Sequence, residues 1–256
     1  MIIALSAGHN VINNGYFDHG SISPCGRFKE ADITRRTVAL LKPTLEAMGH
    51  TVHDVTPYDQ KFYSGGGKSA SRKAHEERSR RIKVINPDIY IDIHVNAGGG
   101  TGPECLVYST KSKAYPYARK ITNSIAKNTG LTNRRGVKVK PGYWSVTLHP
   151  QPSIIVEGAF IDSPGGKDMR VLTPEVYAYS IASCFGEVND LLTEKRVREI
   201  CKEEIAKAFR KPDKDKHWAD KHLANLIAKG LVIHERRLDD PITRGETLNL
   251  LDQITE

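Results

Sequence analysis

The stretch Ile89-Tyr90-Ile91-Asp92-Ile93-His94 is an apolar run that contains one aspartate and ends in a histidine. Isoleucine occupies every second position, and the following Gly98-Gly99-Gly100 segment ends the run, as expected for a buried strand. Residues 2–5 and 153–160 form further apolar runs of the same kind. Strands of this composition are typical of a parallel sheet that is covered on both faces.

Helical patterns alternate with these strands along the chain. Residues 30–48 carry apolar side chains at helical spacing and stop at Gly49, whereas residues 10–27 are rich in Asn, Gly, Ser and Pro and predict a loop. This alternation predicts an α/β fold with an open, twisted, mostly parallel sheet flanked by helices. The expected strands are residues 2–5, 51–55, 89–94, 104–108 and 153–160, and the expected helices are residues 30–48, 72–84, 115–127 and 174–192.

Two histidines and two glutamates lie at or near the ends of these elements: His9, Glu30, His94 and Glu157. Strand ends of a parallel sheet meet at one edge, so we expect the four side chains to approach one another there. Two imidazoles and one carboxylate suffice to hold a catalytic Zn²⁺ with the fourth position left to water. We therefore expect His9, Glu30 and His94 to bind the metal and Glu157 to act as general base.

Glu157 has an alternative role as a structural group. A carboxylate in a strand as apolar as residues 153–160 is costly unless it is paired or functional. The structural alternative is a salt bridge with Arg78 or Lys138. Two further histidines near these motifs, His19 and His149, are expected to be ordinary exposed side chains.

The motifs around these residues resemble those of a known enzyme family. Ser6-Ala7-Gly8-His9 resembles a Pro-Gly-His opening, His94-Val95-Asn96-Ala97 matches a His-x-Asn-Ala signature, and residues 156–161 match a Val-Glu-x-Gly-Phe-Ile block. Glu30 stands where the second metal ligand of that family does, and Arg135-Gly136-Val137-Lys138 is similar to the family's Arg-Gly-Val-Lys turn. In this order the motifs resemble the zinc-dependent N-acetylmuramoyl-L-alanine amidases of the amidase-3 family.

The resemblance covers roughly residues 1–190 and implies a peptidoglycan hydrolase. Such an enzyme cleaves the amide bond between N-acetylmuramic acid and L-alanine with zinc-activated water. Glu157 would accept a proton from the attacking water and return it to the departing amine. Asn96, Arg135 and Lys138 are the candidate groups for binding peptide carboxylates or sugar amides.

The C-terminal part of the chain has a different composition. We expect a catalytic domain over residues 1–192, a linker helix over residues 193–213, and a small helical module over residues 214–256. The module contains Trp218-Ala219 and Gly230-Leu231-Val232, and is similar to a single S-layer homology repeat. Such repeats bind secondary wall polymers, and self-association of the module is the alternative.

The composition of the chain restricts the classes of binding partner but does not identify one. The 256 residues are 39% hydrophobic and carry a formal net charge of +8, which favours anionic partners. Basic runs are not interleaved with aromatic residues as a nucleic-acid platform requires, and no apolar stretch approaches the ~20 residues of a membrane span. The four cysteines form no C-x-x-C pair and predict no disulfide framework. Bacterial peptidoglycan is the expected partner, with no nucleic acid and no membrane.

The start of the sequence has no basic segment followed by a long apolar one, which predicts synthesis without a secretory signal. A phage endolysin that stays in the host cytoplasm until lysis fits this expectation. A bacterial autolysin or a mother-cell sporulation amidase is the alternative setting. A zinc peptidase or deacylase would use the same metal on another substrate. A basic nucleic-acid-binding protein would leave the His and Glu motifs without a purpose.

Overall fold

The computed structural model describes residues 1–187, so the predicted linker helix and C-terminal module lie outside the described residues. Its main sheet has six strands in the order β4-β1-β6-β9-β7-β8. Their bounds are Thr51–Asp54 for β4, Ile2–Ala7 for β1, Ile89–Asn96 for β6, Ser153–Phe160 for β9, Glu104–Val107 for β7 and Gly136–Val139 for β8.

The four strands β4, β1, β6 and β9 run parallel to one another, whereas β7 is antiparallel to β9 and parallel to β8. The predicted open and mostly parallel sheet is therefore confirmed. The register places His94 of β6 beside Glu157 of β9, and Glu157 beside Glu104 of β7. Three strands from distant parts of the sequence thus bring polar groups to one region of the sheet.

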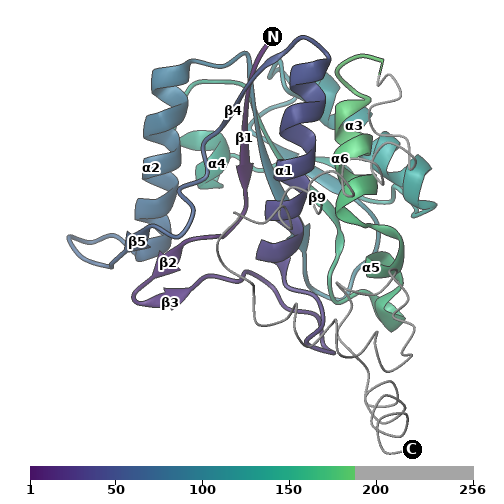
Figure 1. Ribbon diagram of the computed structural model, residues 1–256, viewed down its shortest axis with the longest axis horizontal. Coiled ribbons are helices and arrows are strands. Elements are labelled where there is room, and N and C mark those ends of the chain that lie inside the picture. Colours follow the sequence, from purple (N-terminus) through teal and green to yellow (C-terminus); the bar gives the residue numbers. More distant parts are fainter. Residues whose placement is uncertain (188–256) are drawn as a thin grey trace, which may run out of the picture. The chain divides into compact units, whose positions relative to one another are not determined.

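Helices cover both faces of the sheet, which explains why its strands are apolar on both sides (Figure 1). On one face α1 (Glu30–Ala47), α3 (Tyr115–Thr129) and α6 (Pro174–Ala182) pack together over the larger core. On the other face lie α2 (Ala70–Ile85) and the short α4 (Trp144–Thr147). Ile91 and Ile93 point into the larger core, while Tyr90 packs under α2 with Ile82.

Two predicted elements differ in the structure. The last helix ends at Ala182 and not near residue 192, and Phe185 just beyond it stacks on Tyr117 with ring centroids 5.0 Å apart. The predicted loop at residues 10–27 contains two strands of two residues each, β2 (Ile12–Asn13) and β3 (Tyr16–Phe17). They form a small sheet with β5 (Lys61–Phe62), and strands this short leave no periodic pattern in the sequence.

A 3₁₀ turn at Pro164–Gly166 and the short helix α5 (Lys167–Val171) connect β9 to α6. In the described part of the chain, no helix combines the length and apolar composition needed to cross a membrane.

Candidate active site

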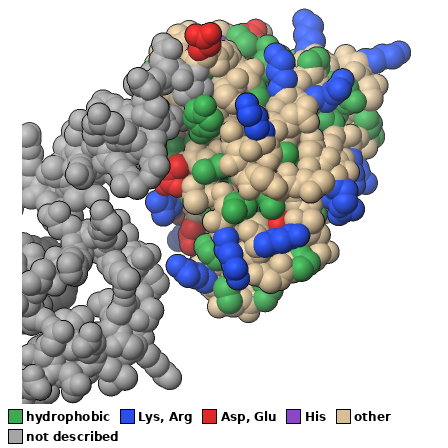
Figure 2. Space-filling model, turned by 90° about the vertical axis from the view of Figure 1, so that its right-hand side faces the viewer, with side chains coloured by type: hydrophobic (Ala, Val, Ile, Leu, Met, Phe, Trp, Pro, Cys, Tyr) green, Lys and Arg blue, Asp and Glu red, His purple; other side chains and the backbone are tan. Residues whose placement is uncertain are grey.

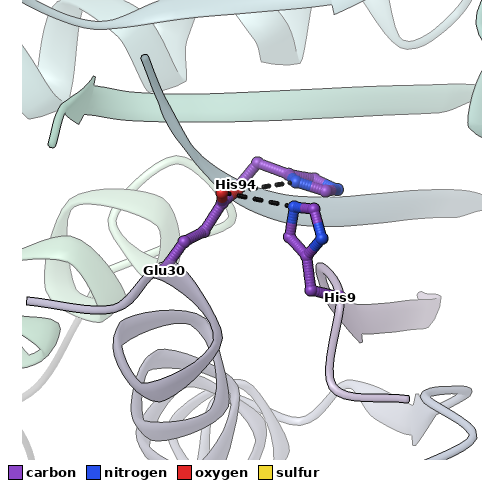
Figure 3. Close-up of side chains that lie close together, drawn as sticks. All are labelled: His9, Glu30 and His94. Atoms are coloured by element: carbon purple, nitrogen blue, oxygen red, sulfur yellow. Dashed lines mark hydrogen bonds and ion pairs between the residues drawn. The ribbon is translucent and has the colours of Figure 1, made fainter. Parts of the chain in front are cut away.

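Three polar side chains from separate elements meet at one edge of the main sheet (Figure 3). His9 follows β1, Glu30 is the first residue of α1, and His94 lies near the end of β6. The Glu30 carboxylate lies between the two imidazoles: its Oε2 is 3.2 Å from Nε2 of His9, and its Oε1 is 3.0 Å from Nδ1 of His94. The structure therefore brings together the three residues that the sequence predicts as metal ligands.

The backbone after β1 is shaped so that His9 and His94 can approach. A Cβ at Gly8 would lie 2.4 Å from the His94 ring, so a larger residue does not fit there. The backbone of His9 has a φ of 62°, which is unfavourable for a residue with a side chain. The buried guanidinium of Arg78 stabilises this conformation, because its Nη2 donates to the His9 carbonyl at 2.6 Å.

Glu30 is held by backbone donors as well as by the histidines. Its side chain is only 3% exposed, and it lies at the positive N-terminal end of α1. The backbone N–H of Ser21 donates to Oε2 at 2.9 Å, and that of Val95 donates to Oε1 at 3.0 Å. Both carboxylate oxygens are thereby fixed toward the space between the imidazoles.

The protonation of the three groups is coupled. Burial alone would lower the pKa of His9, but hydrogen bonds with Asp18 and Glu30 raise it to about 9. The pKa of His94 is also raised well above its usual value, against the effect of burial, by Asp92 and Glu30. Burial would raise the pKa of Glu30, but the two histidines lower it. A metal ion that binds here must displace the imidazole protons, so its affinity depends on pH.

The donor set fits a catalytic zinc ion. Zinc bonds of about 2.0–2.2 Å in a tetrahedral arrangement place neighbouring ligand atoms about 3.3–3.5 Å apart. The 3.2 Å contact with His9 and the 3.0 Å contact with His94 involve different oxygens of Glu30, and one ligand atom from each of the three residues lies within 4.8 Å of the other two. Within residues 1–187, no other group of three or more His, Cys, Asp or Glu side chains is spaced to hold a metal ion.

Glu157 lies beside this cluster in β9, opposite His94 in the register. Its Oε2 is inaccessible to solvent and has no hydrogen-bond partner in the described part of the chain. Burial raises the pKa of Glu157 to about 7, against the charge of His94 and with contributions from Glu30 and Glu104. An unpaired buried carboxylate oxygen needs an explanation, and a carboxyl that titrates near neutral pH is suited to accept a proton from water.

The alternative role for Glu157, a salt bridge with Arg78 or Lys138, does not occur among residues 1–187. Arg78 donates to the carbonyl of His9, and Nζ of Lys138 lies 3.5 Å from Oε2 of Glu104. Within the described residues, Glu157 therefore forms no salt bridge with a lysine or an arginine.

The three predicted substrate-binding residues converge on Glu104. Nδ2 of Asn96 donates to Oε1 of Glu104 at 2.8 Å, while Arg135 and Lys138 pair with Oε2. The Arg135 guanidinium also lies over the ring of Phe160, 5.3 Å from its centroid. Because Glu104 pairs with Glu157 in the sheet register, the polar group around Glu104 lies next to the proposed base.

Three carboxylates at the site are missing from the sequence prediction: Asp18, Asp92 and Glu104. Asp92 and Glu104 share one signal, since each is an acidic residue within an apolar strand, as Glu157 is. Asp18 follows the two-residue strand β3 in a polar loop, and nothing in its local sequence distinguishes it.

His19 and His149 do not belong to the cluster. The expectation that His149 is exposed is wrong, because it is only 6% exposed and packs edge-on against Tyr90, with ring centroids 5.3 Å apart. The backbone beside it is held under α2, where Ser79 donates to the carbonyl of Leu148 at 2.8 Å. His19 is partly buried and packs edge-on against Phe17.

Known proteins are similar to this chain in sequence and in fold. A protein of Clostridium perfringens with no characterised function is 26% identical over a 263-residue alignment that covers 100% of this chain and 70% of that protein. The germination-specific N-acetylmuramoyl-L-alanine amidase of Bacillus subtilis is 25% identical over 188 residues, 71% of this chain and 75% of the relative.

The CwlD amidase of Clostridioides difficile, solved in complex with the GerS lipoprotein, has the same fold, with a TM-score of 0.57 and 24% identity. The match covers 72% of this chain and 93% of CwlD. Residues 3–188 match the amidase-3 family, which is described as N-acetylmuramoyl-L-alanine amidase. This match spans well over half of the chain and includes His9, Glu30, His94 and Glu157, and the chain therefore belongs to the amidase-3 family of N-acetylmuramoyl-L-alanine amidases.

Proposed function

We propose that the protein is a zinc-dependent peptidoglycan hydrolase that cleaves the amide bond between N-acetylmuramic acid and L-alanine. The observation that supports this most strongly is the meeting of His9, Glu30 and His94 beside an unpaired carboxylate, Glu157. Family membership supplies the substrate class, and the donor set supplies the metal.

The residues of the chain have separate roles in this reaction. A zinc ion held by His9, Glu30 and His94 would supply Lewis-acid activation of water and stabilise negative charge on the substrate carbonyl oxygen. Glu157 accepts a proton from the attacking water at its unpaired carboxylate, because burial has raised its pKa to about 7. It then donates that proton to the nitrogen of L-alanine as the amide bond breaks. The neutral amine is a far better leaving group than its anion.

The substrate side of the site is proposed to lie around Glu104. Asn96, Arg135 and Lys138 hold hydrogen-bonding and cationic groups next to Glu157, and Glu104 fixes their directions. Two cations against one carboxylate leave an excess positive charge, which suits the carboxylates of a stem peptide. Asn96 offers an amide for the sugar or peptide backbone.

The metal proposal is tested with one pair of histidine variants. His94→Ala removes one of three ligands and should strip zinc and abolish wall cleavage. His53→Ala changes an exposed histidine in β4 that lies outside the cluster, and should leave both unchanged. The measurement is zinc per chain together with release of N-terminal alanine from purified wall. A zinc peptidase or deacylase would instead release other termini or acyl groups from the same wall.

The cellular setting has two candidates. In the first, a phage endolysin, the protein stays in the host cytoplasm until lysis and then degrades the wall. The second is a sporulation or germination amidase, which the similarity to the B. subtilis germination-specific enzyme favours. Comparing activity on vegetative wall with activity on spore cortex separates the two, since an endolysin should degrade vegetative wall at least as fast. An exported autolysin is the remaining setting in which such an amidase acts on vegetative wall.

Residues 214–256 are proposed to bind a secondary wall polymer through the S-layer-homology-like module, or to self-associate. A nucleic-acid partner is not proposed. On the face shown in Figure 2, Lys and Arg side chains are dispersed over the surface and do not form the continuous basic stripe typical of nucleic-acid binding.

A further inference from the structure

The two imidazoles of the cluster present different nitrogens to Glu30. His9 directs Nε2 toward the carboxylate, at 3.2 Å, whereas His94 directs Nδ1, at 3.0 Å. The two nitrogens of an imidazole point away from each other, so each ring has a second nitrogen that faces elsewhere. In both rings this second nitrogen meets an aspartate (Asp18 for His9 and Asp92 for His94).

Asp92 is placed by the strand itself. It lies two residues before His94 in β6, so the two side chains lie on the same face of the sheet. Its Oδ2 is 3.3 Å from Nε2 of His94. Asp92 is completely buried, and its orientation is fixed because Ser6 donates to Oδ1 and Ser145 donates to Oδ2 at 2.5 Å. Such a buried carboxylate is costly unless it serves its partners.

Asp18 is held beside His9 by the small sheet. Its Oδ1 lies 2.9 Å from Nδ1 of His9 and also accepts from the backbone N–H of Gly20 at 3.0 Å. Its Oδ2 accepts from Nδ2 of Asn13 at 3.1 Å. Both oxygens are therefore fixed, although Asp18 is about one quarter exposed while Asp92 is inaccessible.

We infer that Asp18 and Asp92 are positioning residues that fix the tautomers of the two metal-binding histidines, so that His9 binds zinc through Nε2 and His94 through Nδ1. In the structure Asp18 is hydrogen-bonded to His9, and Asp92 lies within ion-pair distance of His94. With the metal bound, each aspartate would accept the N–H of the nitrogen that does not bind the metal and leave the lone pair of the other nitrogen directed at the ion. This inference rests on the proposed zinc site. It assigns a role to two carboxylates that neither ligate the metal nor contact the reacting bond.

The prediction for metal affinity is quantitative. Loss of such an outer carboxylate typically weakens metal binding 10- to 100-fold. Asp92→Asn and Asp18→Asn in the full-length protein should each weaken zinc binding by about that factor, measured by competition with a chromophoric chelator. The matched control is Asp168→Asn. Asp168 is equally buried, but it accepts hydrogen bonds from Thr101 and from the backbone of Gly102 and Phe160, so its loss should leave zinc affinity unchanged.

Tautomers are read directly by long-range ¹H–¹⁵N NMR of the imidazole rings in the zinc-loaded protein. The inference predicts opposite patterns: a protonated Nε2 and a metal-bound Nδ1 in His94, and the reverse in His9. The same metal-bound nitrogen in both rings would overturn the inference. So would native zinc affinity in both aspartate variants. If Asp92→Asn does not fold, the more exposed Asp18→Asn variant and the wild-type NMR pattern still decide the question.

The zinc content of His94→Ala separates failure of the positioning role from failure of the proposed zinc site. If His94→Ala retains a full equivalent of zinc, the metal site itself is wrong. If His94→Ala loses zinc while both aspartate variants keep native affinity, the metal site holds and only the positioning role fails.

Discussion

As the proposed general base, Glu157 must accept a proton from water at a carboxylate that is largely buried. Replacing Glu157 with Gln preserves the shape of the side chain but removes the proton acceptor. We expect full zinc content and a 10²- to 10⁴-fold loss of kcat, the usual effect of removing a general base. Zinc analysis and steady-state rates on soluble muropeptides measure the two quantities. A near-native rate would make Glu157 a structural residue.

The same substitution should lower activity but increase the free energy of unfolding at alkaline pH. Burial raises the pKa of Glu157 from 4.5 to about 7 in the metal-free protein. The folded state therefore binds the proton more tightly than the unfolded state, so the stabilisation is complete below pH 4.5 and is lost as the pH rises through 7. Glu157→Gln should remove this dependence and be more stable than wild type at pH 8, by roughly 3 kcal/mol at most.

Urea unfolding of the metal-free proteins at pH 5 and pH 8 measures this difference. The gain of the Gln variant over wild type should be larger at pH 8 than at pH 5. An equal difference at both values would mean that the carboxyl does not titrate with a raised pKa.

At the scale of secondary-structure elements, β8 gives a matched pair of lysines. Lys138 faces Glu104, whereas Lys140 is exposed just beyond the end of the strand. If the group around Glu104 binds stem-peptide carboxylates, Lys138→Gln should raise KM for a muropeptide about 10-fold with little change in kcat, the effect expected for one charge-assisted hydrogen bond. Lys140→Gln should behave as wild type. Equal KM values for both variants would place the substrate elsewhere.

The central strands are well predicted from the sequence because the residues that mark each strand lie within it or directly after it. The bounds of β9 match the prediction, and β6 differs only by extending two residues further, since apolar β-branched residues and the glycines after them mark buried strands. His94 and Glu157 could be identified because a polar residue in such a strand is conspicuous. The helical spacing of apolar residues after a loop-like stretch also placed Glu30 at the start of α1.

Features that depend on contacts between distant segments could not be predicted. The interaction of Asp18 with His9 needs the small sheet, whose strands have two residues each. The left-handed backbone of His9 is held by Arg78, which is 69 residues away in the sequence. The stacking of Phe185, just beyond α6, on Tyr117 is a third contact of this kind. None of these contacts leaves a periodic or local signal.

At the scale of the whole molecule, the chemistry should need only the N-terminal part of the chain, because every proposed site residue precedes Ser163. A truncation near Leu192 should hydrolyse small soluble muropeptides at the full-length rate. It should be slower on intact wall, where a wall-bound module raises the local substrate concentration. Loss of activity on soluble fragments would show that residues 193–256 belong to the catalytic fold.

Sedimentation separates the two roles proposed for the C-terminal module. Equal mass of full-length and truncated protein, with wall binding lost on truncation, would support polymer recognition. A full-length dimer that becomes a monomer on truncation would support self-association.

We propose that zinc held by His9, Glu30 and His94 drives hydrolysis of the bond between N-acetylmuramic acid and L-alanine. The most direct test of this proposal is end-group analysis of purified peptidoglycan digested by the full-length protein, before metal removal, after it, and after zinc is restored. We expect new N-terminal alanine without new reducing sugar ends, loss of this release on metal removal, and recovery with one equivalent of zinc. New reducing ends, or alanine release that persists without metal, would contradict it.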